Sequence, residues 1–348
     1  MRRRIKLLLP LIALLAPASA MAQAMPQISQ VDRIRLAEAF RIAEKLGDKV
    51  WKGWSKAPFA IVLVTAEHEF LIRHPKPPKD FTPLKLDALL RSEVYFRKRV
   101  FQPSLLATLF LEGVPTIVIG QAENTDAKTS TRWVVTLLHE HFHQLQYSQP
   151  DYAAATNALN LSHGDQTGMW MLNFPFPYAA PEVNKNFSAL CRALADALQR
   201  KNKLAAYIEA RRQFKESLSE DDYKYFSFQL WQEGFARYTE YRIAGLAASQ
   251  YRPSAQFRSL KDFTPFRDAC ERIIQLPKLL DLSLEKDQRV AFYLVGAAEA
   301  ILLDDINPKW QQQYFANKFF TERYFLIASY KGDLSLWQLL FPWRLFEN

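Results

Sequence analysis

Apolar residues near the N-terminus of the 348-residue chain follow first a helical and then a strand period. From Gln30 to Leu46 they recur every three or four residues, which predicts a helix that ends near Gly47. The runs FAIVLVT and EFLIRH are rich in β-branched and aromatic residues, and the run SLLATLFLEGVPTIVIG indicates a second strand pair with a turn near Gly113. These runs predict a small β-sheet in the N-terminal part of the chain.

The pattern becomes helical after Gly120. The polar stretch QAENTDAKTST offers several helix N-caps, and RWVVTLLHEHFHQLQY then predicts a helix that ends before Pro150. Nearly all of the remaining sequence has helical spacing, as in FSALCRALADALQ, LAAYIEARRQFKESL, YFSFQLWQEGFARYTEYRIAGLA and VAFYLVGAAEAILLDD. The exception is the aromatic, Pro- and Gly-rich segment 157–182, a long loop that either caps the core or forms the wall of a cleft.

These patterns predict an α+β fold in one domain, residues 25–348. An N-terminal lobe with the small sheet takes about residues 25–150, and a helical lobe takes about residues 151–348. No Pro-, Gly- or Ser-rich linker separates the two lobes.

Residues 1–24 have the composition of a secretory signal peptide. A basic start with Arg2, Arg3, Arg4 and Lys6 precedes an apolar run from Leu7 to Leu15 and then small residues that suit a cleavage site. That run is too short to span a membrane, and no later segment is long and apolar enough to do so. We therefore expect a periplasmic or secreted protein without a membrane span.

The net charge bears on the expected binding partners, and the two cysteines bear on a possible disulfide. The net charge is +9, and the four positive charges in residues 1–24 leave +5 for the rest, with no basic stripe interleaved with aromatic residues. Nucleic acid is therefore not an expected partner. Cys191 and Cys270 either pair in an oxidising compartment or remain buried thiols, and the sequence leaves both open.

The stretch LLHEHFHQLQ contains three of the six histidines. His139 and His143 are four residues apart and project from the same face of the predicted helix, whereas His141 points to the other side. With Glu140 they form the pattern HExxH, in which two imidazoles bind zinc and the glutamate acts as general base and acid for a water that attacks a carbonyl carbon. The sequence thus predicts a Zn²⁺ site suited to hydrolysis.

A catalytic zinc site usually has a third protein ligand. The metzincin pattern is excluded, because Gln146 and Gln149 stand where it requires glycine and histidine. The candidates that remain are His163 and Asp165 in the aromatic loop, and a glutamate on a later helix.

The stretch WQEGFARYTEY, residues 231–241, resembles the NEGFAxYxE stretch of aminopeptidase-N-like and glycyl-aminopeptidase-like gluzincins. The resemblance implies a zincin-like fold, with Glu233 as the third zinc ligand. Gly234 and Ala236 are small, so we expect this helix to approach the HExxH helix closely.

Two shorter stretches add to the resemblance. Tyr293 begins YLVGA, which is similar to the YxKGA-type stretch whose tyrosine donates a hydrogen bond to the oxyanion, although Val295 replaces the lysine. The alternative is a core tyrosine with a satisfied hydroxyl. GQAEN resembles the GxMEN stretch that binds a substrate's free amino group, which would make Glu123 an exopeptidase residue. The resemblance is confined to such short stretches, and 89 residues separate His143 from Glu233 where those families have a short connection.

The sequence as a whole predicts a zinc-dependent peptidase in the periplasm or outside the cell, acting on a peptide or protein substrate that pairs in an extended form with the TIVIG strand. One alternative is a non-catalytic zinc-binding or scaffold protein with a relic protease site, and another is a hydrolase of a non-peptide amide. The sequence does not distinguish endopeptidase from exopeptidase action.

Overall fold

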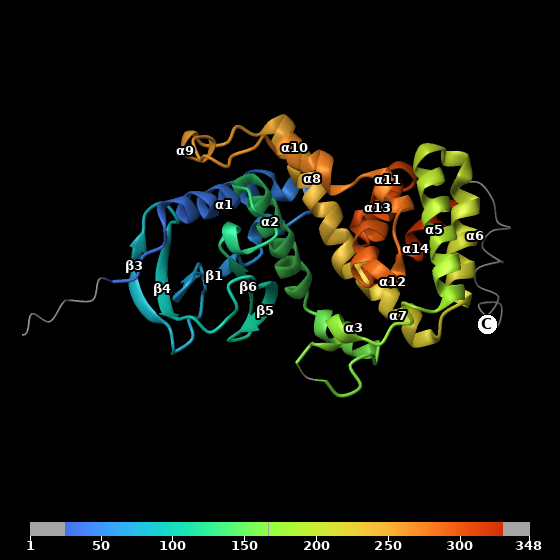
Figure 1. Ribbon diagram of the computed structural model, residues 1–348, viewed down its shortest axis with the longest axis horizontal. Helices are drawn as coiled ribbons and strands as arrows, with labels where there is room; N and C mark the ends of the chain where they lie inside the picture. The colour runs from blue at the N-terminus through green and yellow to red at the C-terminus, as the bar shows by residue number, and fades with distance from the viewer. Residues whose placement is uncertain (1–24, 166, 330–348) are drawn as a thin grey trace, which may run out of the picture.

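The computed structural model describes residues 25–165 and 167–329, and its fold is α+β (Figure 1). A six-stranded mixed sheet occupies the N-terminal half, and a mostly helical region follows it, as expected. The predicted signal peptide, residues 1–24, lies outside the described residues, as do residues 330–348 of the predicted helical lobe. None of the described helices has the length and apolar character that crossing a membrane requires.

The sheet has the strand order β3-β4-β2-β1-β6-β5. The β1 and β6 strands are parallel, and the other neighbours are antiparallel. Both predicted strand pairs are present, and the β5–β6 hairpin turns through Glu112 and Gly113, which both have positive φ. The bounds are β1 Ala60–Val64, β2 His68–Ile72, β3 Thr82–Asp87, β4 Ser92–Lys98, β5 Leu106–Leu111 and β6 Val114–Gly120.

The sequence patterns did not predict the pair formed by β3 and β4. Most β3 side chains are exposed, so no apolar run marks the strand. The expectation that the TIVIG strand pairs with a substrate is wrong, because β6 lies between β1 and β5 and both of its edges are occupied. Among the described residues, the free edge on that side of the sheet belongs to β5.

Two helices, α1 (Gln30–Val50) and α2 (Ser130–Tyr147), pack on one face of the sheet (Figure 1). Alternate β1 side chains explain this layer, because Ile61 and Leu63 join the core under the helices while Val62 and Val64 pack on the opposite face. The α1 helix does not end at Gly47. It continues to Val50, so Gly47 is an interior residue of the helix, and it packs against the Trp54 ring.

The helical region follows α2 and packs against the side of α2 that faces away from the sheet. Its helices are α3 Tyr152–Ala158, α4 Trp170–Asn173, α5 Pro181–Gln199, α6 Leu204–Glu216, α7 Glu220–Gln229, α8 Phe235–Gln250, α9 Ala255–Arg258, α10 Phe266–Ile273, α11 Leu276–Leu280, α12 Leu284–Asp287, α13 Val290–Ile306 and α14 Glu322–Ser329. A π-helical segment, η4 (Leu230–Gly234), joins α7 to α8, and the short 3₁₀ segments are η1 Trp54–Lys56, η2 Ala122–Asn124, η3 Lys201–Lys203 and η5 Trp310–Gln312.

The two cysteines are free thiols. Cys191 is buried in α5, and Cys270 in α10 contacts the carbonyl oxygen of Tyr241 at 3.6 Å. Burial raises the pKa of both thiols above the ordinary value. A disulfide therefore does not hold these segments together.

Candidate metal centre

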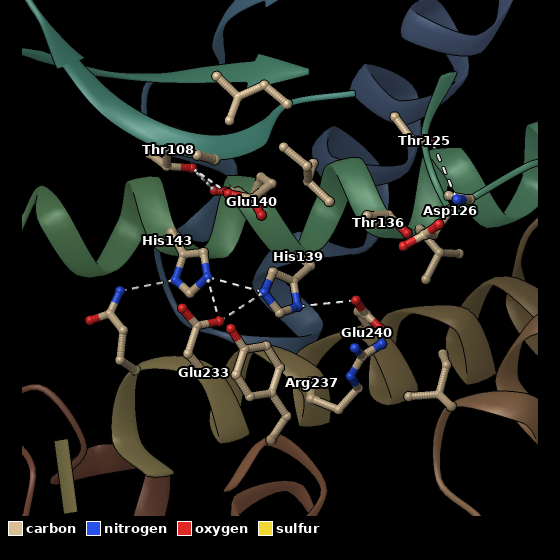
Figure 2. Close-up of a pocket in the computed structure, with 18 of the residues that line it drawn as sticks. Thr108, Thr125, Asp126, Thr136, His139, Glu140, His143, Glu233, Arg237 and Glu240 are labelled. Atoms are coloured by element: carbon tan, nitrogen blue, oxygen red, sulfur yellow. Dashed lines mark hydrogen bonds and ion pairs between the residues drawn. The ribbon is translucent and has the colours of Figure 1, made fainter. Parts of the chain in front are cut away.

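Three side chains converge where α2 faces η4 and α8 (Figure 2). The Nε2 atoms of His139 and His143 are 3.0 Å apart. Glu233 Oε2 lies 3.5 Å from the first Nε2 and 3.4 Å from the second. Tetrahedral zinc with ordinary bond lengths holds its ligand atoms about 3.4 Å apart, so the donor set and its spacing fit zinc.

Groups behind the two imidazoles orient them. His143 Nδ1 lies 2.6 Å from Gln146 Oε1, so this nitrogen carries the hydrogen and Nε2 keeps its lone pair toward the centre. His139 Nδ1 lies 3.0 Å from Glu240 Oε1, off the line of its N–H, and the contact is an ion pair. Arg237 in turn contacts the same Glu240 carboxylate at 2.6 Å. The structure thus directs both Nε2 atoms to one point.

Charge at this point favours a bound cation. Burial lowers the pKa of His139, but the Glu233 and Glu240 carboxylates outweigh it and raise that pKa to about 10. Burial by itself raises the pKa of Glu233, but the charges of His143 and His139 and their hydrogen bonds hold it well below its ordinary value. An ionised carboxylate and an imidazole that favours a positive charge are the electrostatic surroundings of a metal site.

Glu140 lies beside the same point. A ligand atom from each of His139, Glu140 and His143 falls within 4.8 Å of the others, and all three residues are buried. Thr108 Oγ1 on β5 donates to Glu140 Oε2 at 2.8 Å (Figure 2). The edge strand therefore holds the carboxylate that the sequence assigns as general base.

Tyr293 on α13 lines the cleft and is not a core residue. Its ring is 6.5 Å from the His139 ring, and its hydroxyl oxygen accepts a hydrogen bond of 2.6 Å from Arg289 Nη1. Burial and the nearby Glu233 charge raise its pKa well above the ordinary value, so the phenol keeps its hydrogen. The phenol also shares a hydrogen bond with the Glu233 carboxylate, so its hydrogen must leave that carboxylate before it is donated elsewhere in the cleft.

Two glycines set the position of Glu233 relative to Tyr293. A Cβ atom on Gly234 would lie 2.5 Å from Gly296 Cα, and one on Gly296 would lie 2.8 Å from Gly234 Cα. The segment that carries Glu233 approaches the HExxH helix closely, as expected, since Gln146 donates hydrogen bonds to the carbonyl oxygens of Trp231 and Gln232. Gly234 itself does not face that helix, because it contacts α13. The backbone contact brings α13 and its tyrosine close to the π-helical segment that carries Glu233.

The π-helical segment also determines which side chains face α2. Glu233 approaches both imidazoles, while the adjacent Gln232 lies 3.0 Å from His143 Nδ1. A π turn adds one residue to the helical turn, and such turns are frequent at functional sites. Consecutive residues therefore reach the same histidine pair.

His141 faces the other side of α2, as predicted. Its ring stacks on Phe59 at 3.7 Å between centroids, and Nδ1 lies 2.9 Å from Gln144 Oε1. Burial lowers its pKa to about 3. This histidine is a packed side chain of the α1–α2 core.

The alternative ligands lie elsewhere. His163 is exposed, and Asp165 accepts hydrogen bonds from the backbone of Thr167 and Trp170 within its own loop. Glu123 forms an ion pair with Arg35 at 2.9 Å, and it does not line the cleft. The proposed exopeptidase role of Glu123 therefore loses its geometric basis.

The site opens into a cleft of about 1550 Å³. Residues of β5, α2, α8, α10 and α13 line it, and so do Thr167, Gly168, Met169, Met171 and Leu172 of the aromatic loop. The reading of this loop as a cleft wall is thus confirmed, although Phe174 and Phe176 of the same segment are buried in the core.

The sequence interpretation missed several supporting residues. Glu240 lies seven residues after Glu233, which is two helical turns, so this spacing was a signal that both carboxylates face α2. Thr108 carried no recognisable signal, because it contacts a residue of another segment. Gln146 and Arg289 carried none either, because each lies outside the motif whose residue it contacts. No family model, curated protein or solved structure matches the chain.

Proposed function

We propose that this protein is a zinc-dependent peptidase with a zincin-like arrangement of sheet edge and active-site helix. The observation that carries the proposal is the convergence of His139, His143 and Glu233 at 3.0–3.5 Å, with Glu140 beside them in a large cleft. A storage site for zinc does not need a carboxylate held by a second element next to the ligands.

Bound zinc would supply Lewis acidity, which polarises a carbonyl group and makes a nearby water a stronger acid. Glu140, held by Thr108, takes the proton of the attacking water and passes it to the leaving amine. Tyr293, held by Arg289, donates its hydrogen to the carbonyl oxygen as that oxygen gains negative charge. Gln146 keeps the His143 imidazole in the required tautomer, and the Glu240 carboxylate pairs with the Nδ1 side of the His139 imidazole.

The free edge of β5 supports a peptide substrate. It lines the cleft, and its Thr108 contacts Glu140, so an extended chain that pairs with β5 passes the candidate centre. An isolated small amide has no use for an edge strand of this length. We therefore favour peptide hydrolysis over hydrolysis of a non-peptide amide.

Glu140→Gln tests this function, because it keeps the size of the side chain and removes the base. Zinc-loaded wild type should cleave members of a defined peptide library, with the products identified by mass spectrometry. The variant should keep one zinc per chain and lose roughly 10²–10⁴ of the rate. Zinc binding without cleavage by wild type would favour a non-catalytic zinc protein.

Glu233→Ala tests the ligand set in the same preparation. We expect a strong loss of zinc affinity, whereas Asp165→Ala should bind zinc like wild type. Equal affinity of both variants would exclude Glu233 as a ligand. The proposed location in the periplasm rests on residues 1–24 alone, and the N-terminal sequence of the mature protein from fractionated cells tests it.

A further inference from the structure

The cleft runs along nearly the whole of α2. Arg132, Thr136, His139, His143 and Tyr147 all line it, and their spacing of three or four residues places them on one face of the helix. From the first to the last, this face is about 22 Å long at 1.5 Å per residue. The candidate metal centre lies between two ends that differ in chemistry.

The end beyond His143 is apolar. Phe110 stacks on Tyr147 at 5.5 Å, and Phe228 of α7 also lines this end. The aromatic loop joins it through the carbonyl oxygen of Met171, which accepts hydrogen bonds from α7. Large apolar side chains are exposed here, at 55% for Phe110, 47% for Met169 and 46% for Leu172.

The end beyond His139 is charged. The cleft there is lined by two carboxylates, Asp126 and Asp268, and by three cations, Lys128, Arg132 and Arg272, and a fourth cation, Lys278 of α11, lines the same cleft. Thr131 Oγ1 bonds the carbonyl oxygen of Thr264, which ties the segment that carries Asp268 and Arg272 to the start of α2. Within residues 25–165 and 167–329, none of these four cations forms an ion pair with a carboxylate.

The strand direction says which end receives which part of a peptide. Just before β5, Leu105 bonds Gly120, whose carbonyl oxygen accepts from Trp133 at the start of α2, and β5 ends where Phe110 meets Tyr147. The strand thus runs from the charged end to the apolar end. An antiparallel peptide, the more frequent pairing, runs the opposite way.

We propose that the cleft selects peptides with an apolar residue before the cleaved bond and carboxylates after it. This inference rests on the proposed function. The carboxylates are acidic side chains or the free C-terminus of the peptide, since both offer the same chemistry to the cations. Arg132 lies nine residues before the midpoint between His139 and His143 on α2. This separation is about 13.5 Å along the helix axis, and an extended peptide spans it with about four residues. The carboxylates therefore belong within about four residues of the cleaved bond.

Matched peptides test the inference. Each is an N-acetylated heptapeptide with one phenylalanine, followed after one alanine by two glutamates, two glutamines or two lysines, and each is made as free acid and as amide. Zinc-loaded wild type should cleave the glutamate peptide about tenfold more efficiently in kcat/KM than the lysine peptide, with the difference mainly in KM, as expected for two or three exposed charge pairs. High salt should reduce the difference.

Further peptides identify the carboxylate and the direction. If the C-terminus is bound, the glutamine free acid should be cleaved faster than its amide. If side chains are bound, the two should be alike and the glutamate amide should retain its advantage. Peptides with the glutamates before the phenylalanine should be poor substrates. Equal kcat/KM for all charge types, or preference for the reversed order, would overturn the inference.

Charge reversal at the basic end provides the matched variant. The triple change Arg132→Glu, Arg272→Glu and Lys278→Glu concerns exposed side chains and should abolish or invert the preference without loss of zinc. The control reverses three exposed cations outside the cleft, Lys79, Lys85 and Arg258, and should behave as wild type. A preference that survives the first triple variant would contradict the proposal.

Binding separates this inference from the proposed function. The zinc-loaded Glu140→Gln protein is titrated with fluorescein-labelled glutamate and lysine peptides, and dissociation constants are measured by anisotropy. Tighter binding of the glutamate peptide supports the polarised cleft even if wild type cleaves nothing, an outcome that would overturn only the peptidase function. Equal dissociation constants would overturn the polarised cleft even if peptides are cleaved.

Discussion

His139 and His141 stand two positions apart on the same helix, in opposite environments. Both are nearly inaccessible, with 5% and 1% exposed. His141 stacks on Phe59 with Gln144 as its polar partner, and burial lowers its pKa to about 3. His139 faces two carboxylates, which outweigh burial and raise its pKa to about 10. The carboxylates on the opposing helix, and not burial, therefore decide whether a histidine of α2 belongs to the core or to a cation site.

The comparison also explains how the metal-free site is stabilised. A positive charge at His139 offsets the buried Glu233 and Glu240, and a metal ion bound there would have to displace that proton. On the other face, a neutral imidazole packs as an aromatic ring.

The largest expected effect is the loss of metal from the carboxylate face. His143→Ala removes a ligand and should leave much less than one zinc per chain after dialysis, measured by atomic emission. His141→Ala should keep one zinc per chain, although the lost packing costs about 2–4 kcal/mol of unfolding free energy. Equal metal loss in both variants would mean that the wrong face was assigned.

The next effect concerns catalysis on the same face. Tyr293→Phe deletes the hydroxyl and should lower kcat by roughly 10²–10³, the cost of one oxyanion donor, while zinc content stays the same. Arg289→Met should lower kcat in wild type but have little further effect in Tyr293→Phe, because Arg289 acts through the tyrosine. Near-normal turnover of Tyr293→Phe would remove this residue from the mechanism.

A smaller effect is expected behind the ligands. Glu240→Gln removes the charge that faces His139 Nδ1 and keeps the size of the side chain, so zinc affinity should fall about 10–100-fold without loss of the fold. Competition with a chromophoric chelator measures it. Glu271→Gln, an exposed change on α10, serves as the control, and an equal decrease there would contradict a specific role for Glu240.

The smallest effect is the acid sensitivity of the packed face. The folded pKa of His141 is about 3, so between pH 6.5 and 3 the unfolded chain takes up a proton that the folded chain excludes, and stability falls as the pH falls. In metal-free protein, His141→Ala should reduce this slope by up to about 1.4 kcal/mol per pH unit. Urea unfolding at several pH values measures it, and parallel slopes would place His141 in contact with water.

Local patterns predicted much of the fold, and they predicted the two histidines of the candidate metal centre. The strand runs of β1, β2, β5 and β6 and the helix α2 are present where their periods indicate. The four-residue spacing of His139 and His143 was sufficient to place both on one face, because helix geometry alone determines it. By contrast, the mostly exposed β3 has no apolar face for a pattern to reveal.

Local sequence patterns could not predict which segments lie opposite the His139 and His143 face of α2. Only the folded chain shows that β5 and not β6 is the free edge, and that Gly234 packs on Gly296. Strand order depends on how segments pair after the chain has folded, and a glycine's neighbour depends on which helix crosses it. Neither has a period along the chain.

By itself, then, the sequence determined a helix with two imidazoles and a glutamate on one side, because 3.6 residues per turn is a property of the backbone. Tertiary structure decided what that side faces. Glu233 and Glu240 come from a helix about 90 residues later, and Thr108 comes from a strand about 30 residues earlier. A π turn presents Glu233 to α2, and Glu233 and Glu240 together raise the pKa of His139, an effect that His141 lacks.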